Sequence, residues 1–372
     1  MSTSSTTTVS DGTKAEAAGR PSQLREWQRF VSVLLLVLSP LLATGAALEG
    51  LAWWTGETMP MSLASKWQDG APDRIWRGGD GHSFLTYKAA RLADLKPEIV
   101  ALGPSRANSF RGDLFAPHTF FNAGLTGWTF DHYRRFLDLV TRDGYAPRVL
   151  VFDMDYWMFS PGFDHYWVDR FDPQPTSHVA GLLRIIGQLR EDPLTLWRRL
   201  ATAGHAHGLY AVLTGEGFRA DGSPIETPCT PDAQRLLDDG TGVGVPPVQL
   251  TDRMAPEQAA KFEQFVALAK AKHIALIGIQ LPYYGKILNG LNGNPRAGIW
   301  REFESAEWQQ RFAASGVVFF DFADMPEYRD KPEYFINSLE PDARVVDHIM
   351  RLVMADPRVR EWLPNSGTPK AK

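Results

Sequence analysis

The segment PEIVALGPSRANSF, Pro97–Phe110, decides how the fold of this chain is predicted. The apolar run Ile99–Leu102 has the length of a buried strand, and it ends at Gly103. Ser105 follows directly after Pro104. Because a strand that ends in a glycine turn places the next hydroxyl at the edge of a sheet, Ser105 is either a nucleophile or a loop serine that caps the following helix.

The first apolar run covers residues 98–102. Four further apolar runs of strand length follow it, and helical segments lie between the runs. They cover residues 119–124, 148–154, 274–280 and 317–322. This alternation predicts a parallel sheet with helices on both faces, that is, a three-layer α/β domain. Right-handed crossovers bring the loops after all five strands to one edge, where ligands bind in such folds. The candidate site residues therefore follow the strands.

The N-terminal region contains an uncharged segment of nineteen residues, Phe30–Leu48, close to the ~20 residues that span a bilayer as a helix. Its flanking residues are Arg20, Arg25, Arg29, Trp53 and Trp54. Basic flanks stay in the cytoplasm, and Trp rings settle at the headgroups. We therefore predict a single-pass anchor in the lipid bilayer over residues 30–52, with the N-terminus cytoplasmic. A signal peptide cut near ATGAA, residues 43–47, is the alternative.

Composition predicts the remaining boundaries. Residues 1–29 are expected to be a disordered cytoplasmic tail, and residues 53–80 a linker rich in Gly, Trp and Asp. The folded domain is expected over 81–357, followed by a C-terminal tail at 358–372. A long insertion at 160–255 is interpreted as a helical and loop cap over the sheet edge. Its two expected helices cover residues 178–190 and 194–203.

Charge and cysteine content exclude several classes of function. The net charge of −4 and the lack of a basic reading motif argue against a nucleic-acid partner. Cys229 is the only cysteine, so an intrachain disulfide and a multi-thiol metal site are both excluded. The histidines show neither H-E-x-x-H nor H-x-x-E-H spacing, and we predict no metal and no cofactor.

Two blocks, LKPEIVALGPSRA and FFNAGLTGWTFDHY, together with FINSLEPD before the last expected helix, resemble the SGNH hydrolase superfamily. Within it, the chain is similar to the membrane-anchored DltD-like and alginate-acetylation-type envelope proteins. The resemblance covers roughly residues 95–155 and 270–355. It implies a flavodoxin-like SGNH fold facing the periplasm from a bacterial inner membrane. It also implies a role in cell-envelope or exopolysaccharide O-acyl (acetyl) modification, with a multispan membrane acyltransferase and a polysaccharide as partners.

The resemblance implies catalytic roles for two residues of this chain. At two further catalytic positions of the family, this chain has different residue types. Ser105 would be the nucleophile, and the backbone N–H of Gly124 would help to form the oxyanion hole. The family's D-x-x-H pair falls here on Asn337 and Glu340. A carboxylate with an ordinary pKa of ~4.3 is a weak base for a serine hydroxyl. The alternative is therefore a degenerate, non-catalytic member that binds a polysaccharide or scaffolds an acyltransferase complex.

Other polar and aromatic residues near the same loops are candidates for the base or for substrate binding. His82 and His118 are the first candidates for a replacement base, whereas His348 is expected to point elsewhere. Arg106 could bind an anionic group or form an ordinary ion pair. The remaining candidates for substrate contacts are Asp153, Asp155, Trp128 and Trp157. Carboxylates two apart can run acid–base chemistry or make structural hydrogen bonds, and indole rings suit either sugar faces or a core.

Overall fold

The computed structural model describes residues 20–71, 73–79, 83–166, 177–225, 250–337 and 339–364. The chain divides after Leu51 into two compact units. Helix α1 (Arg20–Trp54) supplies the described part of the first unit. Its stretch Leu24–Trp54 is long and apolar enough to cross a membrane, and its most apolar window is not buried. This supports the predicted membrane association, as a single-pass anchor or a signal sequence.

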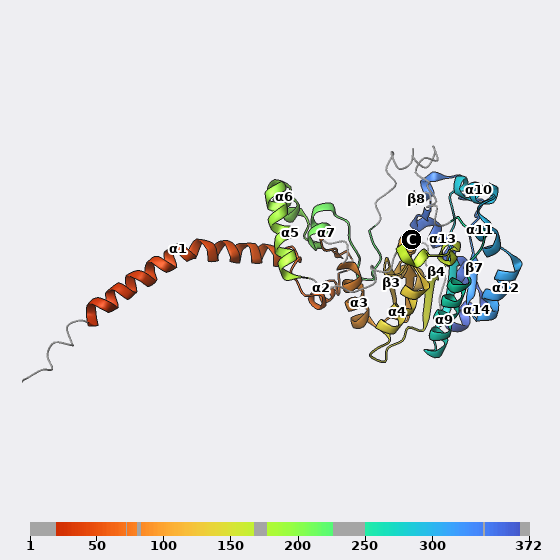
Figure 1. Cartoon of the computed structure of the whole chain (residues 1–372), viewed down its shortest axis with the longest axis horizontal. Coiled ribbons are helices and arrows are strands. Elements are labelled where there is room, and N and C mark those ends of the chain that lie inside the picture. Colours follow the sequence, from red (N-terminus) through yellow and green to blue (C-terminus); the bar gives the residue numbers. More distant parts are fainter. Residues whose placement is uncertain are drawn as a thin grey trace, which may run out of the picture. The chain divides into compact units, whose positions relative to one another are not determined.

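The second unit contains a five-stranded parallel sheet, and all five predicted strands are present (Figure 1). Its strands are β2 (Ile99–Gly103), β3 (Phe120–Gly124), β4 (Val149–Asp153), β6 (Ala275–Gln280) and β7 (Val318–Asp321). They lie in the order β3-β2-β4-β6-β7, which in chain order is the 2-1-3-4-5 arrangement of flavodoxin-like sheets. The register pairs Gly103 with Gly124, so the first two strands end side by side.

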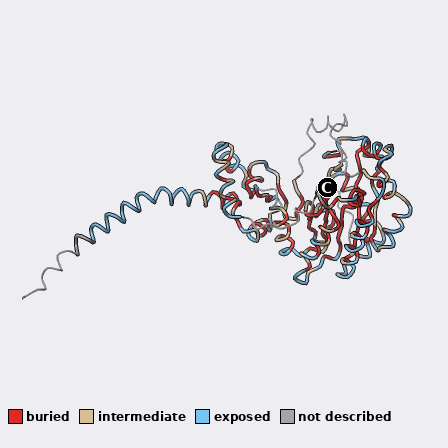
Figure 2. Tube along the Cα trace, viewed as in Figure 1, coloured by how far each residue is buried: buried red, intermediate tan, exposed pale blue. Residues whose placement is uncertain are grey.

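Both faces of the sheet are covered, because the central strands are apolar on both sides. One core joins alternate strand residues, such as Val100 and Phe152, to α4 (Phe130–Val140), α9 (Pro256–Ala271) and α12 (Ala306–Ser315). The other joins the residues between them, such as Ile99 and Val151, to α13 (Ala343–Ala355) and α14 (Pro357–Trp362). Figure 2 shows the buried residues concentrated in the strands. The predicted three-layer α/β arrangement is therefore confirmed.

Several helices of this unit begin where the sequence supplies a capping side chain or a proline. Their bounds are α2 (Met61–Trp67), α3 (Ser83–Leu95), α4 (Phe130–Val140), α5 (His178–Glu191), α6 (Pro193–Thr202), α7 (Leu209–Thr214), α9 (Pro256–Ala271), α10 (Gly285–Gly293), α11 (Gly298–Phe303), α12 (Ala306–Ser315), α13 (Ala343–Ala355) and α14 (Pro357–Trp362). Side chains of Thr129, Ser305 and Asp342 accept backbone N–H bonds at the starts of α4, α12 and α13. Short strands complete the unit: β1 (Ile75–Trp76), β5 (Ala206–His207), β8 (Phe335–Asn337) and β9 (Glu340–Pro341).

Residues 53–80, predicted as a linker, belong to the second unit instead. They contain α2 and β1, and β1 pairs in parallel with β5 of the insertion. Trp76 is buried and stacks on Tyr87 with ring centroids 4.6 Å apart. Glu57 is also buried and accepts backbone bonds from Gly79 and Leu209. The Gly/Trp/Asp composition was misleading because these partners lie far away in the sequence.

The insertion contains both predicted helices, as α5 and α6. Its described part packs on residues 52–79 and along edge strand β3, where Asn122 N–H donates to Asp221 O (2.7 Å). These contacts place the described part of the insertion beside β3. Residues 167–176 and 226–249 lie outside the described residues, and a cap over the carboxyl edge stays a prediction.

The predicted tail 358–372 is also corrected. It includes most of α14, and Val359 and Leu363 are fully buried in the core beneath α13.

Candidate functional site at the carboxyl edge of the sheet

Ser105 lies just beyond the carboxyl end of β2, which is second in the strand order, between β3 and β4. Within the five-stranded sheet, β2 comes first in the chain. The next two strands, β3 and β4, pack on its two sides, so the order reverses here. Ligands of doubly wound sheets bind at this point. Ser105 begins the 3-10 turn η1 (Ser105–Ser109), is half-buried, and its hydroxyl makes no hydrogen bond to any described residue. Its position suits a nucleophile, but nothing in the described part of the chain takes its proton.

Gly124 is placed beside this turn, but its backbone N–H is already occupied. The N–H donates to Oδ1 of Asn122 (2.6 Å), and the Gly124 carbonyl accepts from Nζ of Lys88 (2.5 Å). A Cβ at this position would lie 2.7 Å from Asn122 Oδ1 and 2.9 Å from Asn108 Oδ1. Close packing of two amide side chains is therefore enough to require glycine here, and the predicted oxyanion donor is not free in this structure.

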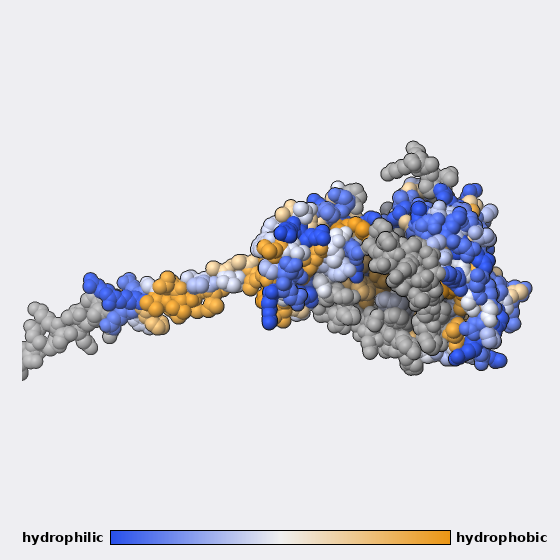
Figure 3. Space-filling view, turned by 90° about the horizontal axis from the view of Figure 1, so that it is seen from above, coloured by the Kyte–Doolittle hydropathy of each residue, from blue (hydrophilic) through white to orange (hydrophobic). Residues whose placement is uncertain are grey.

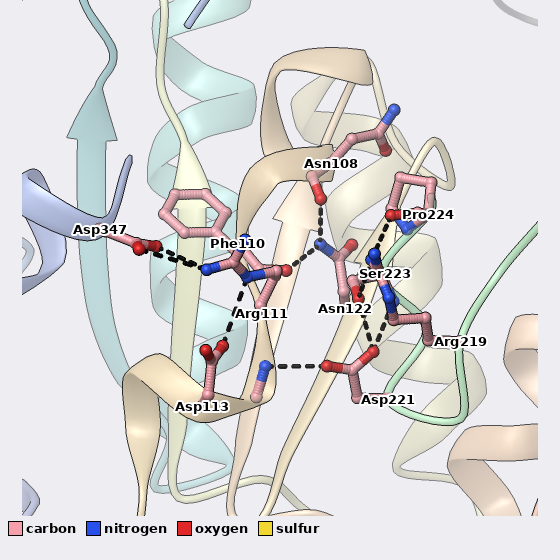
Figure 4. A network of polar contacts seen from close by, with 11 residues as sticks. Asn108, Phe110, Arg111, Asp113, Asn122, Arg219, Asp221, Ser223, Pro224 and Asp347 are labelled. Atoms are coloured by element: carbon pink, nitrogen blue, oxygen red, sulfur yellow. Dashed lines mark hydrogen bonds and ion pairs between the residues drawn. The ribbon is translucent and has the colours of Figure 1, made fainter. Parts of the chain in front are cut away.

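Asn122 holds the turn that begins at Ser105. Its Nδ2 donates to the carbonyl oxygens of Asn108 (3.2 Å) and Phe110 (2.8 Å), as Figure 4 shows. It also donates to the carbonyl oxygen of Ala107 (2.8 Å). The side chain is fully buried, so these carbonyl groups depend on it for a partner. Asn122 was not among the predicted site residues. The signal for it was an asparagine inside the apolar strand FFNAG, because asparagine is uncommon in strands.

Two further contacts in Figure 4 attach the same loop to its neighbours. Arg111 bonds Asp347 on α13 through Nη2 (3.0 and 3.2 Å) and lies 3.4 Å from Asp113. Asp221, on the segment beside β3, accepts from the backbone N–H of Gly112 (2.8 Å). The loop after β2 is thus tied to a helix on one side and to the insertion on the other.

Arg106 forms a buried ion pair across the carboxyl ends of three strands. Its Nε lies 3.0 Å from Asp155 and 3.6 Å from Asp153, both of which follow or end β4. Its guanidinium also donates to the carbonyl oxygens of Leu281, after β6, and Leu339, in the C-terminal hairpin. All three charged side chains are almost completely buried.

Tyr283 and Trp157 complete the surroundings of the guanidinium. Its carbon lies 4.6 Å from the ring centroid of Tyr283 and 5.4 Å from that of Trp157. The Tyr283 hydroxyl donates to Asp155 Oδ1 (2.7 Å). Two aromatic faces and one phenol therefore replace the water that these charges would have at a surface.

The charges of this cluster do not balance unless one carboxyl group holds a proton. Burial, and then the neighbouring Asp155, raise the pKa of Asp153 well above its usual range. Burial also raises the pKa of Asp155, but Arg106 opposes the shift. The arrangement fits a neutral Asp153 that donates to an ionised Asp155, which in turn pairs with Arg106.

The cluster changes how the predicted substrate contacts are understood. Arg106, Asp153, Asp155 and Trp157 contact one another in a buried group, which is how structural ion pairs are arranged. Trp128 is half-buried and lies edge-on to His132, at 6.1 Å between ring centroids. Of the two tryptophans predicted to bind a sugar, only Trp128 is exposed in part; a substrate role for all five residues stays a prediction.

The hairpin of β8 and β9 carries Asn337 and Glu340 to the turn at Ser105. Arg106 bonds Leu339 O, and Ser109 Oγ donates to Pro341 O (3.1 Å). Asn337 is exposed, and its Oδ1 accepts from the backbone N–H groups of Leu339 (2.9 Å) and Glu340 (3.1 Å). The amide oxygen of Asn337 therefore closes its own turn, and it does not orient a base for Ser105.

None of the predicted histidines bonds to Ser105 in the described part of the chain. His118 contacts Glu98 (3.3 Å) at the start of β2 and β3, the opposite edge of the sheet from Ser105. His348 bonds the hydroxyl of Tyr328 (2.9 Å). His82 lies outside the described residues. The interpretation of His118 as a replacement base was therefore wrong, because the strand register places it at the amino edge.

Lys88 is a buried cation that the sequence analysis missed. It is fully buried, bonds Gly124 O, and its Nζ lies 4.5 Å from the ring centroid of Phe218. Burial lowers the pKa of Lys88 to about 7, although Asp221 acts in the opposite direction. Lys88 lies on α3, and the sequence around it has no signal that distinguishes a buried lysine from a solvated one, so only the packing identifies it.

A second pair of acidic groups consists of Asp321, at the end of β7, and Glu304, directly after α11. Both lie beside Gln280, the last residue of β6. With its amide turned toward both carboxyl groups, Gln280 donates to Asp321 Oδ1 (3.1 Å) and Glu304 Oε1 (3.0 Å). Burial, and then Asp321, raise the pKa of Glu304 to about 9. Glu304 therefore holds its proton at neutral pH and can donate it to the neighbouring carboxylate.

Glu304 should make the stability of the second unit depend on pH. Its pKa is higher in the folded state than in the unfolded chain, so stability is lost as pH rises from about 4.5 toward about 9. In the wild type, the free energy of unfolding should fall between roughly pH 5 and pH 8.5, within this interval. We expect this fall to be smaller in Glu304→Gln, as measured by chemical denaturation. The control is Glu307→Gln, an exposed position on α12. A slope equal to that of the wild type would contradict the shared proton.

The described residues contain no group of three or more His, Cys, Asp or Glu side chains that could hold a metal ion. No family model matches the chain, and comparison with curated proteins gives no match. The resemblance to SGNH hydrolases consequently rests on the motifs around Ser105 and Gly124, and membership in that superfamily stays a prediction.

Proposed function

We propose that this chain is a membrane-anchored, periplasm-facing SGNH-like accessory protein of cell-envelope or exopolysaccharide O-acyl modification. In this proposal it binds or scaffolds, as a partner of a multispan membrane acyltransferase, and does not cleave esters itself. α1 holds it in a bacterial inner membrane with the N-terminus in the cytoplasm. The arginines that precede the apolar segment support this orientation.

The observation that carries the non-catalytic role is the occupied N–H of Gly124. An oxyanion hole needs N–H groups aimed at the place where negative charge develops. The N–H of Gly124 is bonded to Asn122 at 2.6 Å, and that side chain is fully buried among the carbonyl groups it satisfies. Freeing the N–H would require Asn122 to leave at least three other hydrogen bonds.

The missing base supports the same conclusion. Acyl transfer needs a group that takes the Ser105 proton as the oxygen attacks, and such help contributes ~10²–10⁴-fold to the rate. Asn337 is engaged in its own turn, and Glu340 has no imidazole ring. Gly124 therefore does not supply an oxyanion donor, and the residues at the positions of the family's Asp and His do not supply a base.

The alternative is a Ser105-dependent O-acyltransferase. The half-exposed, unbonded hydroxyl at the ligand-binding edge favours it. Lys88 is the group that could be neutral near pH 7 and act as a base, since burial lowers its pKa to about 7.

The test measures whether Ser105 reacts. We expect the full chain in detergent to show no fluorophosphonate labelling and no hydrolysis of an activated acetyl ester above the level of Ser105→Ala. Labelling of the wild type that disappears in Ser105→Ala would establish a working nucleophile and contradict the accessory role. In that event, a folded Lys88→Met variant that is no longer labelled would identify Lys88 as the base. Lys270→Met, at an exposed position on α9, is the matched control and should still be labelled.

A further inference from the structure

Helix α5 presents apolar side chains to the outside of the protein. Val179, Leu183 and Ile186 are 63%, 61% and 42% exposed. Their spacing of four and three residues places them on one side of the helix, and Ile185 is buried on another. An amphipathic helix normally turns its apolar side to the core, so this exposure needs a partner.

Helix α6 repeats the pattern. Leu194 and Trp197 are 66% and 50% exposed, whereas Leu196 and Leu200 are buried. The two helices follow each other directly, because Asp192 ends α5 and caps the first turn of α6. We call the five exposed residues Val179, Leu183, Ile186, Leu194 and Trp197 the apolar stripe. Figure 3 shows hydrophobic residues exposed among hydrophilic ones in this helical part of the unit.

The chain itself limits how far α5 can lie from the end of the membrane segment. Arg184 of α5 forms an ion pair with buried Glu57, and Gly181 packs so closely on Thr58 that a Cβ would lie 3.0 Å from its methyl group. Glu57 is only three residues after Trp54, a reach of at most ~10 Å. Trp54 is 57% exposed, as indole rings at the headgroup level of a membrane are.

Basic residues accompany the apolar stripe. Arg190 continues the line of Val179 and Ile186 at the end of α5, and Arg198 lies next to Trp197 on α6; both arginines are exposed. Helices that lie in a membrane interface combine one apolar side with basic residues that face anionic headgroups.

We propose that α5 and α6 lie on the surface of the bilayer, with the apolar stripe inserted at the boundary between headgroups and acyl chains. The proposal rests on the part of the proposed function in which α1 is a retained anchor. The occupant of the stripe is lipid: the short connection to Trp54 places α5 within reach of the interface, and the arginines match anionic headgroups. The second unit would thus have two attachments to the membrane and a restricted orientation above it.

The experiment uses spin labels in the full chain. Cys229→Ser removes the only native cysteine, and labels are then attached singly in Leu183→Cys and Trp197→Cys. Arg199→Cys, an exposed position facing away from the stripe on α6, is the matched control, and Leu36→Cys reports on α1. The protein is reconstituted in phosphatidylcholine vesicles that contain phosphatidylglycerol. Collisions of each label with oxygen and with a water-soluble nickel chelate are measured.

We expect the oxygen-to-nickel collision ratio at positions 183 and 197 to exceed that at 199 severalfold. The corresponding depth is about 5–10 Å below the headgroup boundary. A ratio at 183 or 197 as low as that at 199 would show that the stripe faces water and would overturn the proposal. Low rates with both reagents would mean that protein covers the stripe, which would overturn it as well.

The label in α1 separates the two possible failures. A lipid-like ratio at 36 combined with a water-like ratio at 183 contradicts only the surface contact of α5 and α6. A water-like ratio at 36 contradicts the anchor, and with it the membrane part of the proposed function.

Discussion

Arg106→Ala is expected to lower the free energy of unfolding by about 3–5 kcal/mol, because removing one partner of a buried ion pair leaves the other charge uncompensated. Asp155 lies 3.0 Å from the guanidinium and is fully buried, so its charge would lose its partner in a place that bulk solvent does not reach. The variant also loses the bonds from Arg106 to Leu281 O and Leu339 O. The measurement is denaturant unfolding of the full chain in detergent, followed by the fluorescence of the tryptophans.

A matched control separates this effect from the loss of any arginine. Arg311 pairs with Glu263 at the surface, with side chains 46% and 55% exposed. Arg311→Ala should lower the free energy of unfolding by at most ~1 kcal/mol, since exposed ion pairs contribute little to stability. Equal effects of the two substitutions would contradict the buried ion pair.

The pH dependence of the Arg106→Ala effect gives a second check. Arg106 opposes the rise in the pKa of Asp155, so its removal should raise that pKa further. A carboxyl group with a raised pKa destabilises the fold increasingly as pH rises above its unfolded value of ~3.9. The difference between variant and wild type should therefore be largest at neutral pH and shrink as the pH falls toward ~4. A difference that does not change with pH would point to lost packing.

Asn122→Ala should have the second-largest effect, about 3 kcal/mol or more. The substitution removes partners from the carbonyl groups of Ala107, Asn108 and Phe110 and from the N–H of Gly124. A buried polar group left without a partner costs ~1–3 kcal/mol. Asn294→Ala, at an exposed turn, is the control and should be close to neutral. The quantity measured for both variants is the free energy of unfolding, from denaturant titration.

A second readout of Asn122→Ala concerns the turn at Ser105. Loss of the amide should increase the hydrogen exchange of the backbone N–H groups in η1 and of Gly124 before the unit unfolds globally. Unchanged exchange in these residues at a lowered stability would contradict the role of Asn122 in holding the turn. This result also bears on the proposed function, since the same side chain occupies the N–H that a catalytic site would need.

Local patterns in the sequence were enough for the five strands of the sheet. The five apolar runs and the helical periodicity between them depend only on neighbouring residues, and they predicted β2, β3, β4, β6 and β7. The rule that crossovers are right-handed then placed the loops after the strands at one edge. Ser105 and the hairpin with Glu340 are brought to that edge, as the strand pattern led us to expect.

Composition did not predict the burial of segments whose contacts are with residues far away in the sequence. Residues 53–80 have the content of a linker, yet Glu57 and Trp76 are buried by contacts with residues of the insertion. The segment beyond 357 seemed a tail, but Val359 completes the core under α13. Burial of this kind depends on which elements meet in space, and that information is not present in any local window.

The chemical state of the candidate site was decided by tertiary structure alone. The motif around Ser105 shows which residue types are present, but a hydrogen bond between Gly124 and Asn122, or an ion pair between Arg106 and Asp155, depends on where each side chain points. The sequence is the same whether the N–H of Gly124 is free or hydrogen-bonded. Solvent exclusion sets the protonation of Asp153 and Lys88 in the same way, because the free energy of a charge depends on the surroundings that the whole fold builds around it.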